Sequence, residues 1–238
     1  MKLIFGFAKS FFIYLALCIA TYLMLRILFD YTAFRNDVGF LRFKAPYVDY
    51  PWWKAAFYVH VFTAILALLA GFTQFSNLVL QDHLRLHRLV GRIYAYDILI
   101  VNFPAGMVLA LCANGLLPGR IAFVLLDSLW FTFTLLGVLA VRRGDLSRHR
   151  AMMIRSYALT FSAITLRTWK FILVRNTRID PVHLYMIDAW MGFVPNLLVA
   201  EWWIRSSARR SLRVVSVQSG NSVKPRWLNR RRSAGSSR

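Results

Sequence analysis

Residues that commonly build soluble active sites are scarce in this chain. Only two of its 238 residues are cysteine, Cys18 and Cys112, and both lie inside apolar runs with no CxxC or Cys/His spacing. This excludes a cysteine-rich disulfide framework and gives no information on redox compartment. The sequence also contains no HExxH, P-loop, GxSxG or GxGxxG pattern, so no soluble-enzyme template applies.

Acidic residues are equally scarce, at 10 Asp and Glu against 30 Lys and Arg. In a soluble protein a net charge of +20 would suggest a nucleic-acid partner. However, 58% of the residues are hydrophobic, and apolar runs recur that are long enough, at about 20 residues, to cross a bilayer. We therefore predict a membrane protein whose main partner is the lipid bilayer, and we expect no nucleic-acid binding.

Six apolar segments have the length of a membrane-spanning helix: 5–29, 54–75, 93–113, 119–141, 151–173 and 182–204. Turn or helix-start signals separate several of them: Asp49-Tyr50-Pro51, Leu117-Pro118-Gly119, Arg143-Gly144-Asp145 and Asp180-Pro181. The first segment is too long for a signal peptide and lacks a cleavage site, so we interpret it as a retained helix. The sequence predicts an all-α bundle of six transmembrane helices in one domain, residues 1–204.

The distribution of basic residues predicts the topology. Most of them fall on one side if both termini are cytoplasmic, as the positive-inside rule requires. Residues 205–238 contain ten basic and no acidic residues with many serines, which predicts a disordered cytoplasmic tail. The tail either attracts anionic lipid headgroups, at about 1 kcal/mol per basic residue, or only fixes topology.

The segment 54–75 carries a stripe of small and polar residues at a spacing of four, three, four and three: His60, Ala64, Ala67, Gly71 and Gln74. This spacing keeps the stripe on one helical face. Small residues allow close helix approach in membranes. We expect this face to point into the bundle.

Counting helix rise from the span ends places the in-span polar groups at two levels. The outer level, about 9–12 Å below the outer boundary, comprises His60, Asp127, Arg167 and Asp188. The inner level comprises Asp97, Arg155 and Gln74, with His87 and His149 at its edge. The sequence predicts that Arg155 pairs with Asp97, and that Arg167 pairs with Asp127 or Asp188. Such charges are costly at membrane depth and often functional. The structural alternative is that the pairs lock helices together.

The five histidines allow a weaker hypothesis. His87 and His149 match in depth and are flanked by arginines, as a haem b with two axial ligands would need, but both are near the membrane surface. His60 and His183 differ in depth. A metal at His60, Asp127 and Asp188 would be repelled by Arg167, so we predict no metal site.

Several local patterns together resemble a family of bacterial predicted multi-pass membrane proteins of unknown function. They are His60 with Gln74-Phe75, LHRLVGRIY at 86–94, and RGDLSRHRAMMIRSYALTFSAITLR at 143–167. The resemblance covers about residues 55–173 and implies a bacterial inner-membrane protein. Its signature positions are His60, Gln74, His87, Gly91, Tyr94, His149, Arg155 and Arg167. The chain departs from the family at Met152, where the family usually has Trp, and the resemblance implies no particular activity.

Three classes of function remain open. The leading hypothesis is an intramembrane site that binds or passes a small ligand, an ion or a proton. Its candidate residues are His60, Gln74, His87, Asp97, Asp127, His149, Arg155, Arg167 and Asp188. The second is a redox protein linked to haem b or quinone, and the third is a non-catalytic assembly subunit. The sequence does not decide whether the protein is an enzyme, and it names no catalytic residue, ligand or oligomeric state.

Overall fold

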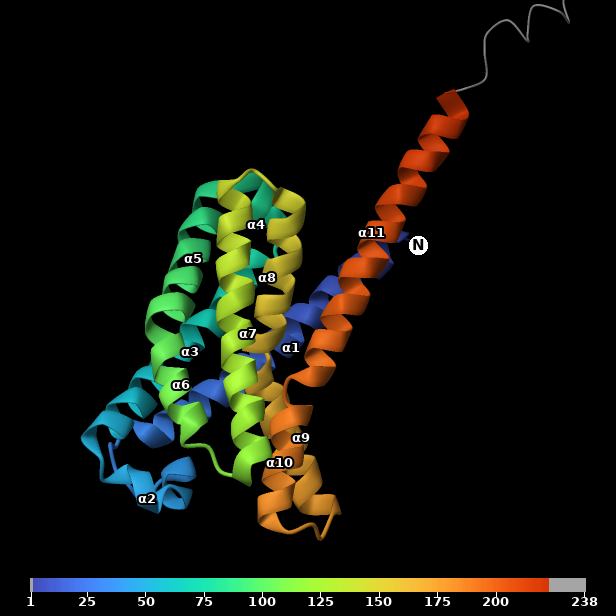
Figure 1. The fold of residues 1–238 in the computed structure, drawn as a ribbon. Coiled ribbons are helices and arrows are strands. Elements are labelled where there is room, and N and C mark those ends of the chain that lie inside the picture. Colours follow the sequence, from blue (N-terminus) through green and yellow to red (C-terminus); the bar gives the residue numbers. More distant parts are fainter. Residues whose placement is uncertain (1, 223–238) are drawn as a thin grey trace, which may run out of the picture. The chain divides into compact units, whose positions relative to one another are not determined.

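The computed structural model describes the backbone of residues 2–222, and the side chains of residues 11–209 except 13, 77 and 78. The secondary structure of the described part consists of helices joined by turns and short loops, with no strand (Figure 1). Its elements are α1 (Lys2–Tyr31), η1 (Gly39–Phe43), α2 (Ala45–Val48), α3 (Pro51–Gln74), α4 (Asn77–Asp82), α5 (Leu84–Tyr96), η2 (Asp97–Asn102), α6 (Phe103–Leu111), α7 (Leu116–Arg142), α8 (Leu146–Thr160), α9 (Ser162–Asn176), α10 (Pro181–Met191) and α11 (Val194–Ser222).

Five helical stretches in the described residues are long and apolar enough to cross a membrane, rather than the six that the sequence predicts. They are Tyr14–Tyr31, Pro51–Gln74, Leu84–Leu111, Leu116–Arg142 and Pro181–Arg209. The predicted span 151–173 is divided at Phe161 into α8 and α9, each of 15 residues. Each half also carries several basic residues, so neither is both long and apolar enough to span.

The chain forms two compact units, residues 1–198 and 199–238. The second unit contains most of α11, which continues to Ser222. The predicted tail therefore begins inside a helix: residues 205–222 are helical where we expected disorder, and residues 223–238 lie outside the described residues. All sites discussed below belong to the first unit.

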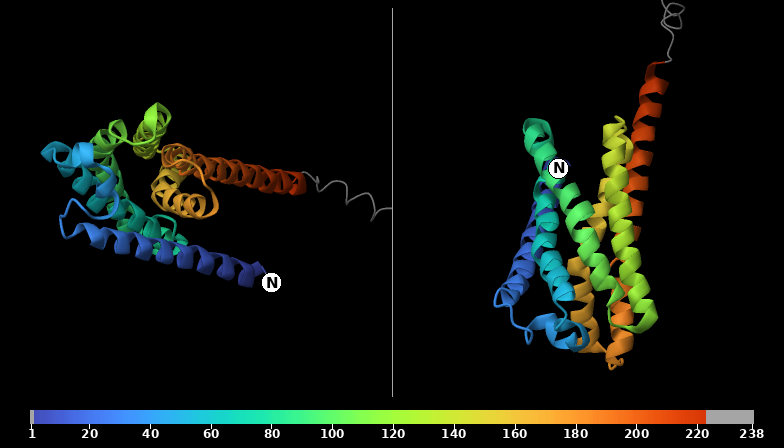
Figure 2. Two further views of the ribbon diagram at one scale, coloured as in Figure 1. Left: turned by 90° about the horizontal axis from the view of Figure 1, so that it is seen from below. Right: turned by 60° about the vertical axis from the view of Figure 1, so that its left-hand side comes forward.

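The helices of the first unit run between two ends, which we call the α2 end and the α4 end (Figures 1 and 2). The α2 end carries η1, α2 and the turns joining α6 to α7 and α9 to α10. The α4 end carries α4 and the turn joining α7 to α8. The sequence predicts that the α2 end faces outward.

The predicted helix starts at Pro51 and Pro181 and the predicted turn at Gly144 are confirmed, whereas Leu117-Pro118-Gly119 lies inside α7, which begins at Leu116. Helix α3 begins at Pro51, and α10 begins at Pro181, where the Asp180 carboxylate accepts hydrogen bonds from the N–H groups of Val182 and His183. Gly144 has φ of +77° in the turn between α7 and α8, a conformation that favours glycine. Asp145 then caps α8 by accepting the N–H of Arg148 at 2.9 Å.

Small residues allow the helices to pack closely. Ala67 and Gly71 of the stripe on α3 are buried, as the sequence predicts. A methyl group on Gly71 would lie 1.8 Å from the hydroxyl oxygen of Tyr157 on α8, so only glycine fits there. The Tyr157 hydroxyl donates to the carbonyl of Leu68 at 2.9 Å, which joins α8 to α3.

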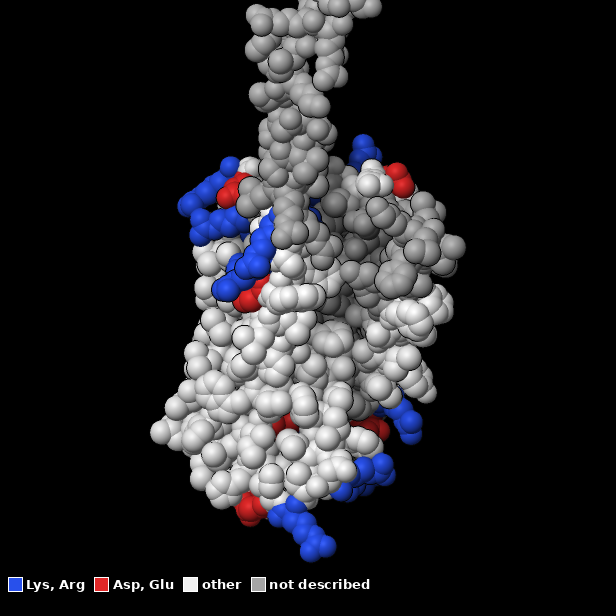
Figure 3. All heavy atoms as spheres, turned by 90° about the vertical axis from the view of Figure 1, so that its right-hand side faces the viewer, with Lys and Arg blue, Asp and Glu red and all other residues white. Residues whose placement is uncertain are grey.

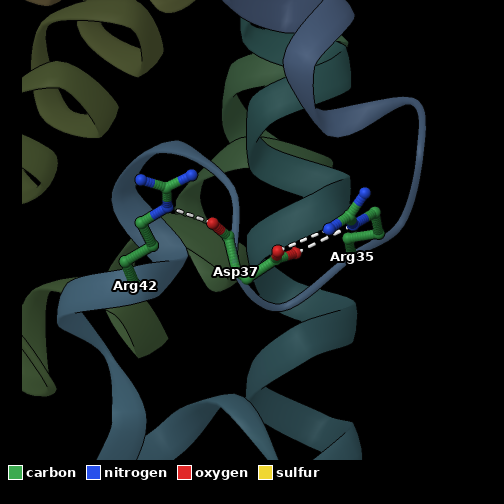
Figure 4. A network of polar contacts seen from close by, with 3 residues as sticks. All are labelled: Arg35, Asp37 and Arg42. Atoms are coloured by element: carbon green, nitrogen blue, oxygen red, sulfur yellow. Dashed lines mark hydrogen bonds and ion pairs between the residues drawn. The ribbon is translucent and has the colours of Figure 1, made fainter.

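Between α1 and α3, the segment 32–50 folds into an ordered cap at the α2 end. Asp37 organises its exposed part: the carboxylate accepts two hydrogen bonds from Arg35, and the carbonyl accepts one from Arg42 (Figure 4). The Arg35 guanidinium lowers the pKa of the Asp37 carboxyl. Because this group is fully exposed, the ion pair adds little to stability.

The most constrained residue of the cap is Lys44, which is buried. Its ammonium group donates to the carbonyl of Cys112 at 2.5 Å and to Oδ1 of Asn114 at 2.8 Å. Cys112 caps the C-terminus of α6, where carbonyl groups and the helix dipole favour a cation. Burial lowers the pKa of Lys44 from 10.5 to about 8. Lys44 thus fixes the cap to the end of α6.

Charged side chains are unevenly distributed on the surface. On the face drawn in Figure 3, most Lys, Arg, Asp and Glu side chains lie toward the two ends, and a broad band of uncharged side chains lies between them. Many large apolar side chains are exposed, among them Leu66, Ile100 and Leu125. An exposed apolar band of this kind suits contact with lipid.

Candidate functional site

The segment η2 is a π-helical turn within the span Leu84–Leu111. The N–H of Phe103 bonds to the carbonyl of Ile98, five residues earlier. Pro104 follows directly and has no N–H to continue the α-helical pattern, which explains why the helix widens here. Single π turns frequently occur at functional sites.

The π turn brings Asp97 and Asn102 together. In an α-helix, residues five apart point about 140° away from each other. Here Asn102 Nδ2 donates to Asp97 Oδ1 at 2.9 Å and to Thr63 Oγ1 on α3 at 3.0 Å. Both acceptors and the donor lie in a buried part of the bundle, because Asp97 and Asn102 are 5% and 0% exposed.

His60 extends this group on α3. Its ring lies beside the Asn102 side chain, one helical turn before Thr63. Three buried polar atoms in this region have no hydrogen-bond partner: His60 Nδ1, Asp97 Oδ2 and Asn102 Oδ1. Such atoms are uncommon, since each costs about 1–3 kcal/mol when buried unsatisfied.

Arg167 on α9 lies within electrostatic range of His60. Its guanidinium makes one hydrogen bond, from Nη1 to the carbonyl of Ala163 at 2.6 Å. No carboxylate of the described residues lies within 4 Å of it, and the side chain is exposed. It also interacts electrostatically with Tyr31 at the end of α1 and with Asp188 on α10.

The side chains of His60, Arg167 and Asp188 lie at similar distances from the α2 end. Counted by helix rise from the α2 end, His60 and Arg167 lie about 14 Å inside and Asp188 about 10 Å inside. Asp188 is 1% exposed and its Oδ1 has no partner. We call the series Asp188, Arg167, His60, Asn102 and Asp97 the polar chain. Four elements contribute to it: α10, α9, α3 and η2.

Asp127 is not part of the polar chain, although the sequence predicts it at the same depth. It lies on α7 against Gly106 of α6, where an added methyl group would approach Asp127 Oδ1 to 2.7 Å. Its Oδ2 is buried without a hydrogen-bond partner. No hydrogen bond or ion pair of the described residues joins it to Arg167, so equal depth alone does not group the two.

Gln74, His87 and His149 gather near the α4 end. Gln74 Nε2 donates to the carbonyl of His87 at 3.1 Å. His149 Nδ1 lies 2.8 Å from the carbonyl of Gly137, which fixes the orientation of the ring. The two histidines, on α5 and α8, are close enough to interact electrostatically.

Arg155 lies on α8, six residues after His149. Its guanidinium contacts Met152, with Nη1 3.8 Å from Sδ, and lies 5.9 Å from the centre of the Phe133 ring. Asp97 takes its hydrogen bond from Asn102 instead of the Arg155 that the sequence predicts.

A second buried network, which the sequence analysis missed, joins α5, α7 and α8. The Tyr94 hydroxyl lies 2.7 Å from Ser156 Oγ and 2.9 Å from Thr160 Oγ1, while Ser156 Oγ lies 2.7 Å from Thr134 Oγ1. Trp130 Nε1 donates to Thr160 at 3.0 Å. Its hydroxyls satisfy one another, so this network stabilises the bundle and offers no free atom to a ligand.

The sequence pattern does not single out Asn102, Thr63 or Tyr31. An asparagine inside an apolar span, two residues before Pro104, was the available signal for Asn102. Thr63 lies in a groove of about 440 Å³ beside α3 and α5 that is also lined by Asp97 and Arg92. The described residues contain no group of three His, Cys, Asp or Glu side chains able to hold a metal ion.

The fold and the apolar helices define a multi-pass membrane protein. Residues 57–204 match the family described as "Predicted membrane protein (DUF2306)", and the chain belongs to this family. The match continues through α10 into α11, beyond the limit of 173 that the sequence resemblance suggests. No curated protein and no solved structure matches the chain.

Proposed function

We propose that the protein binds or passes a small ligand or ion, protons included, at an intramembrane site formed by the polar chain. One observation carries the proposal: the polar chain contains both hydrogen-bond donors and hydrogen-bond acceptors that have no partner among the described residues. Arg167 uses one of its five N–H donors, while Asp97, Asn102 and Asp188 each keep an acceptor without a partner. A ligand, water or proton would satisfy these groups.

A purely structural role for the polar chain is less consistent with these contacts than a role in binding. Residues that hold helices together are expected to bond to one another, as Tyr94, Ser156, Thr134 and Thr160 do. Polar groups inside a membrane that lack such partners commonly mark ion or substrate pathways. This contrast favours a functional role over the alternative of an assembly subunit.

The proposal is tested by proton movement in proteoliposomes that contain a pH-sensitive dye. We expect the wild-type protein to dissipate an imposed pH gradient faster than protein-free vesicles, and His60→Gln to abolish the difference. His183→Gln is the matched control, because His183 is exposed at the α2 end and pairs only with Asp180. Wild-type protein that neither moves protons nor binds any of the probes described below would refute the proposal.

A haem-linked redox function is the second candidate, and a specific observation favours it. His87 and His149 lie near one another on different helices, and the Gly137 carbonyl orients His149 as carbonyl groups commonly orient ligating histidines. If haem b binds there, it would supply one-electron chemistry. A visible spectrum of protein expressed with ample haem tests this: a Soret band lost in His149→Ala supports it, and the absence of the band in wild type excludes it.

Localisation and orientation follow from the sequence argument. We propose the bacterial inner membrane, with the α4 end and both termini in the cytoplasm. In this orientation the polar chain opens toward the outer side, because Arg167, His60 and Asp188 all lie nearer the α2 end. Cysteine labelling from outside intact cells at an introduced Asp37→Cys site tests the orientation.

A further inference from the structure

Arg167 presents unused hydrogen-bond donors at a position where none is expected. It lies nine residues before the end of α9 at Asn176, about 14 Å by helix rise. Among the described residues only the Ala163 carbonyl accepts from it, and the residue is exposed. An arginine at such depth normally has a carboxylate or another acceptor.

Lys170 adds a second cation on the same face of α9. Residues three apart on a helix lie one above the other, so Lys170 follows Arg167 toward the α2 end. Its ammonium group lies 5.8 Å from the centre of the Phe43 ring in η1, and the side chain is exposed. A ligand arriving from the α2 end would reach Lys170 before Arg167.

The negative charge near Arg167 and Lys170 does not balance their two positive charges. Asp188 interacts electrostatically with both cations, but it is one carboxylate against two positive charges. Its carboxylate makes no ion pair within 4 Å with either cation among the described residues, so it does not occupy their N–H groups. The pair therefore retains one net positive charge and several free donors, which suits a single anionic group.

We propose that Arg167 and Lys170 bind the carboxylate or phosphate of an anionic ligand that enters from the α2 end. Arginine recognises both groups through paired N–H donors, and lysine supplies a point charge. This inference rests on the proposed function, because it names the chemical class of ligand at the Arg167 end of the polar chain. The anion can come from the aqueous phase or from a lipid headgroup.

Soluble anions are tested on the purified full-length protein in a neutral detergent. Binding of benzoate and inorganic phosphate is measured by isothermal titration, with benzamide as the uncharged analogue of benzoate. We expect at least one anion to bind and benzamide not to bind. Arg167→Gln should weaken anion binding about tenfold or more, as expected for the loss of a charge-assisted bond. Arg167→Lys should retain part of the affinity, and Lys170→Gln should weaken it less than Arg167→Gln.

The lipid source is tested in nanodiscs. Native mass spectrometry is expected to find phosphatidylglycerol retained by wild type over phosphatidylcholine, and lost in Arg167→Gln, if the ligand is a headgroup. Arg178→Gln is the matched control, because Arg178 is an exposed arginine in the turn after α9. Lys170→Gln provides a second test if Arg167→Gln does not fold.

Two results would overturn the inference. One is that neither soluble anion binds better than benzamide and no anionic lipid is retained. The other is that the affinities of Arg167→Gln and Lys170→Gln equal those of wild type. If His60-dependent proton movement persists in either case, only the anion site fails and the proposed function stands.

Discussion

Lys44 allows the sharpest test of the structure outside the membrane-spanning helices. Its ammonium group is buried against the end of α6, and burial lowers its pKa from 10.5 to about 8. Between these two values the unfolded chain holds a proton on Lys44 that the folded protein does not. The free energy of unfolding must therefore rise with pH through this window. Below about pH 8 both states are protonated, and the contribution of Lys44 is constant.

The magnitude follows from the size of the shift. Each pKa unit corresponds to about 1.4 kcal/mol, so the shift predicts a rise of about 3 kcal/mol between pH 8 and 10.5. In a chain of this length that is about 6–12 °C in melting temperature. Lys44→Met removes the titrating group, so the difference between wild type and Lys44→Met isolates it from other groups that titrate in the same range.

The assay is thermal unfolding in detergent from pH 7 to 10.5, with Lys54→Met as a control at the start of α3. The melting temperature of wild type should rise relative to that of Lys44→Met above pH 8, while Lys54→Met should follow wild type. Parallel curves for wild type and Lys44→Met across this range would show that Lys44 is not buried as a cation against Cys112 and Asn114.

Three further variants test the packing and the polar groups. Gly71→Ala should destabilise the protein by about 3 kcal/mol, because the methyl group displaces Tyr157 and its hydrogen bond; an unchanged melting temperature would mean that α3 and α8 are not in contact there. Ser156→Ala should cost about 1–3 kcal/mol in the same measurement, since it removes the hydrogen bonds that Ser156 makes with the buried hydroxyls of Tyr94 and Thr134. The double replacement Asp97→Leu with Asn102→Leu should instead leave thermal stability equal or higher, because apolar residues replace incompletely bonded polar ones. A loss comparable to that of Ser156→Ala would assign Asp97 and Asn102 a structural role.

The sequence predicts the helices and their turns well where one residue decides the local structure. Pro51, Pro181, Gly144 and Asp145 act through their own backbone or side chain, so no tertiary information is needed. The inward face of α3 is equally predictable, because Ala67 and Gly71 recur at helical spacing.

The site is only partly predictable, because depth along a helix does not give direction around it. Counting residues placed Asp127 level with Arg167, yet Asp127 packs against Gly106. The pairing of Arg155 with Asp97 assumed an unbroken α-helix. The π turn before Pro104 redirects Asp97 toward Asn102, and a one-residue change in register of this kind is not visible in a hydrophobicity pattern.

The break at Phe161 shows a similar limit. The sequence treats 151–173 as one span with two arginines, but the structure divides it into α8 and α9. Arg155 and Arg167 then belong to different helices. Arg155 packs on Met152 and Phe133, whereas Arg167 belongs to the polar chain and lies within electrostatic range of His60.

The central claim is that the polar chain is incomplete without a ligand, water or ion. It is tested most directly by a high-resolution density map of the protein in lipid nanodiscs. We predict density of a bound molecule or ordered water within hydrogen-bond distance of Arg167, and further density at Asp97 Oδ2 or Asn102 Oδ1. Arg167 bonded directly to a carboxylate of the chain, with no density between the helices, would contradict the account.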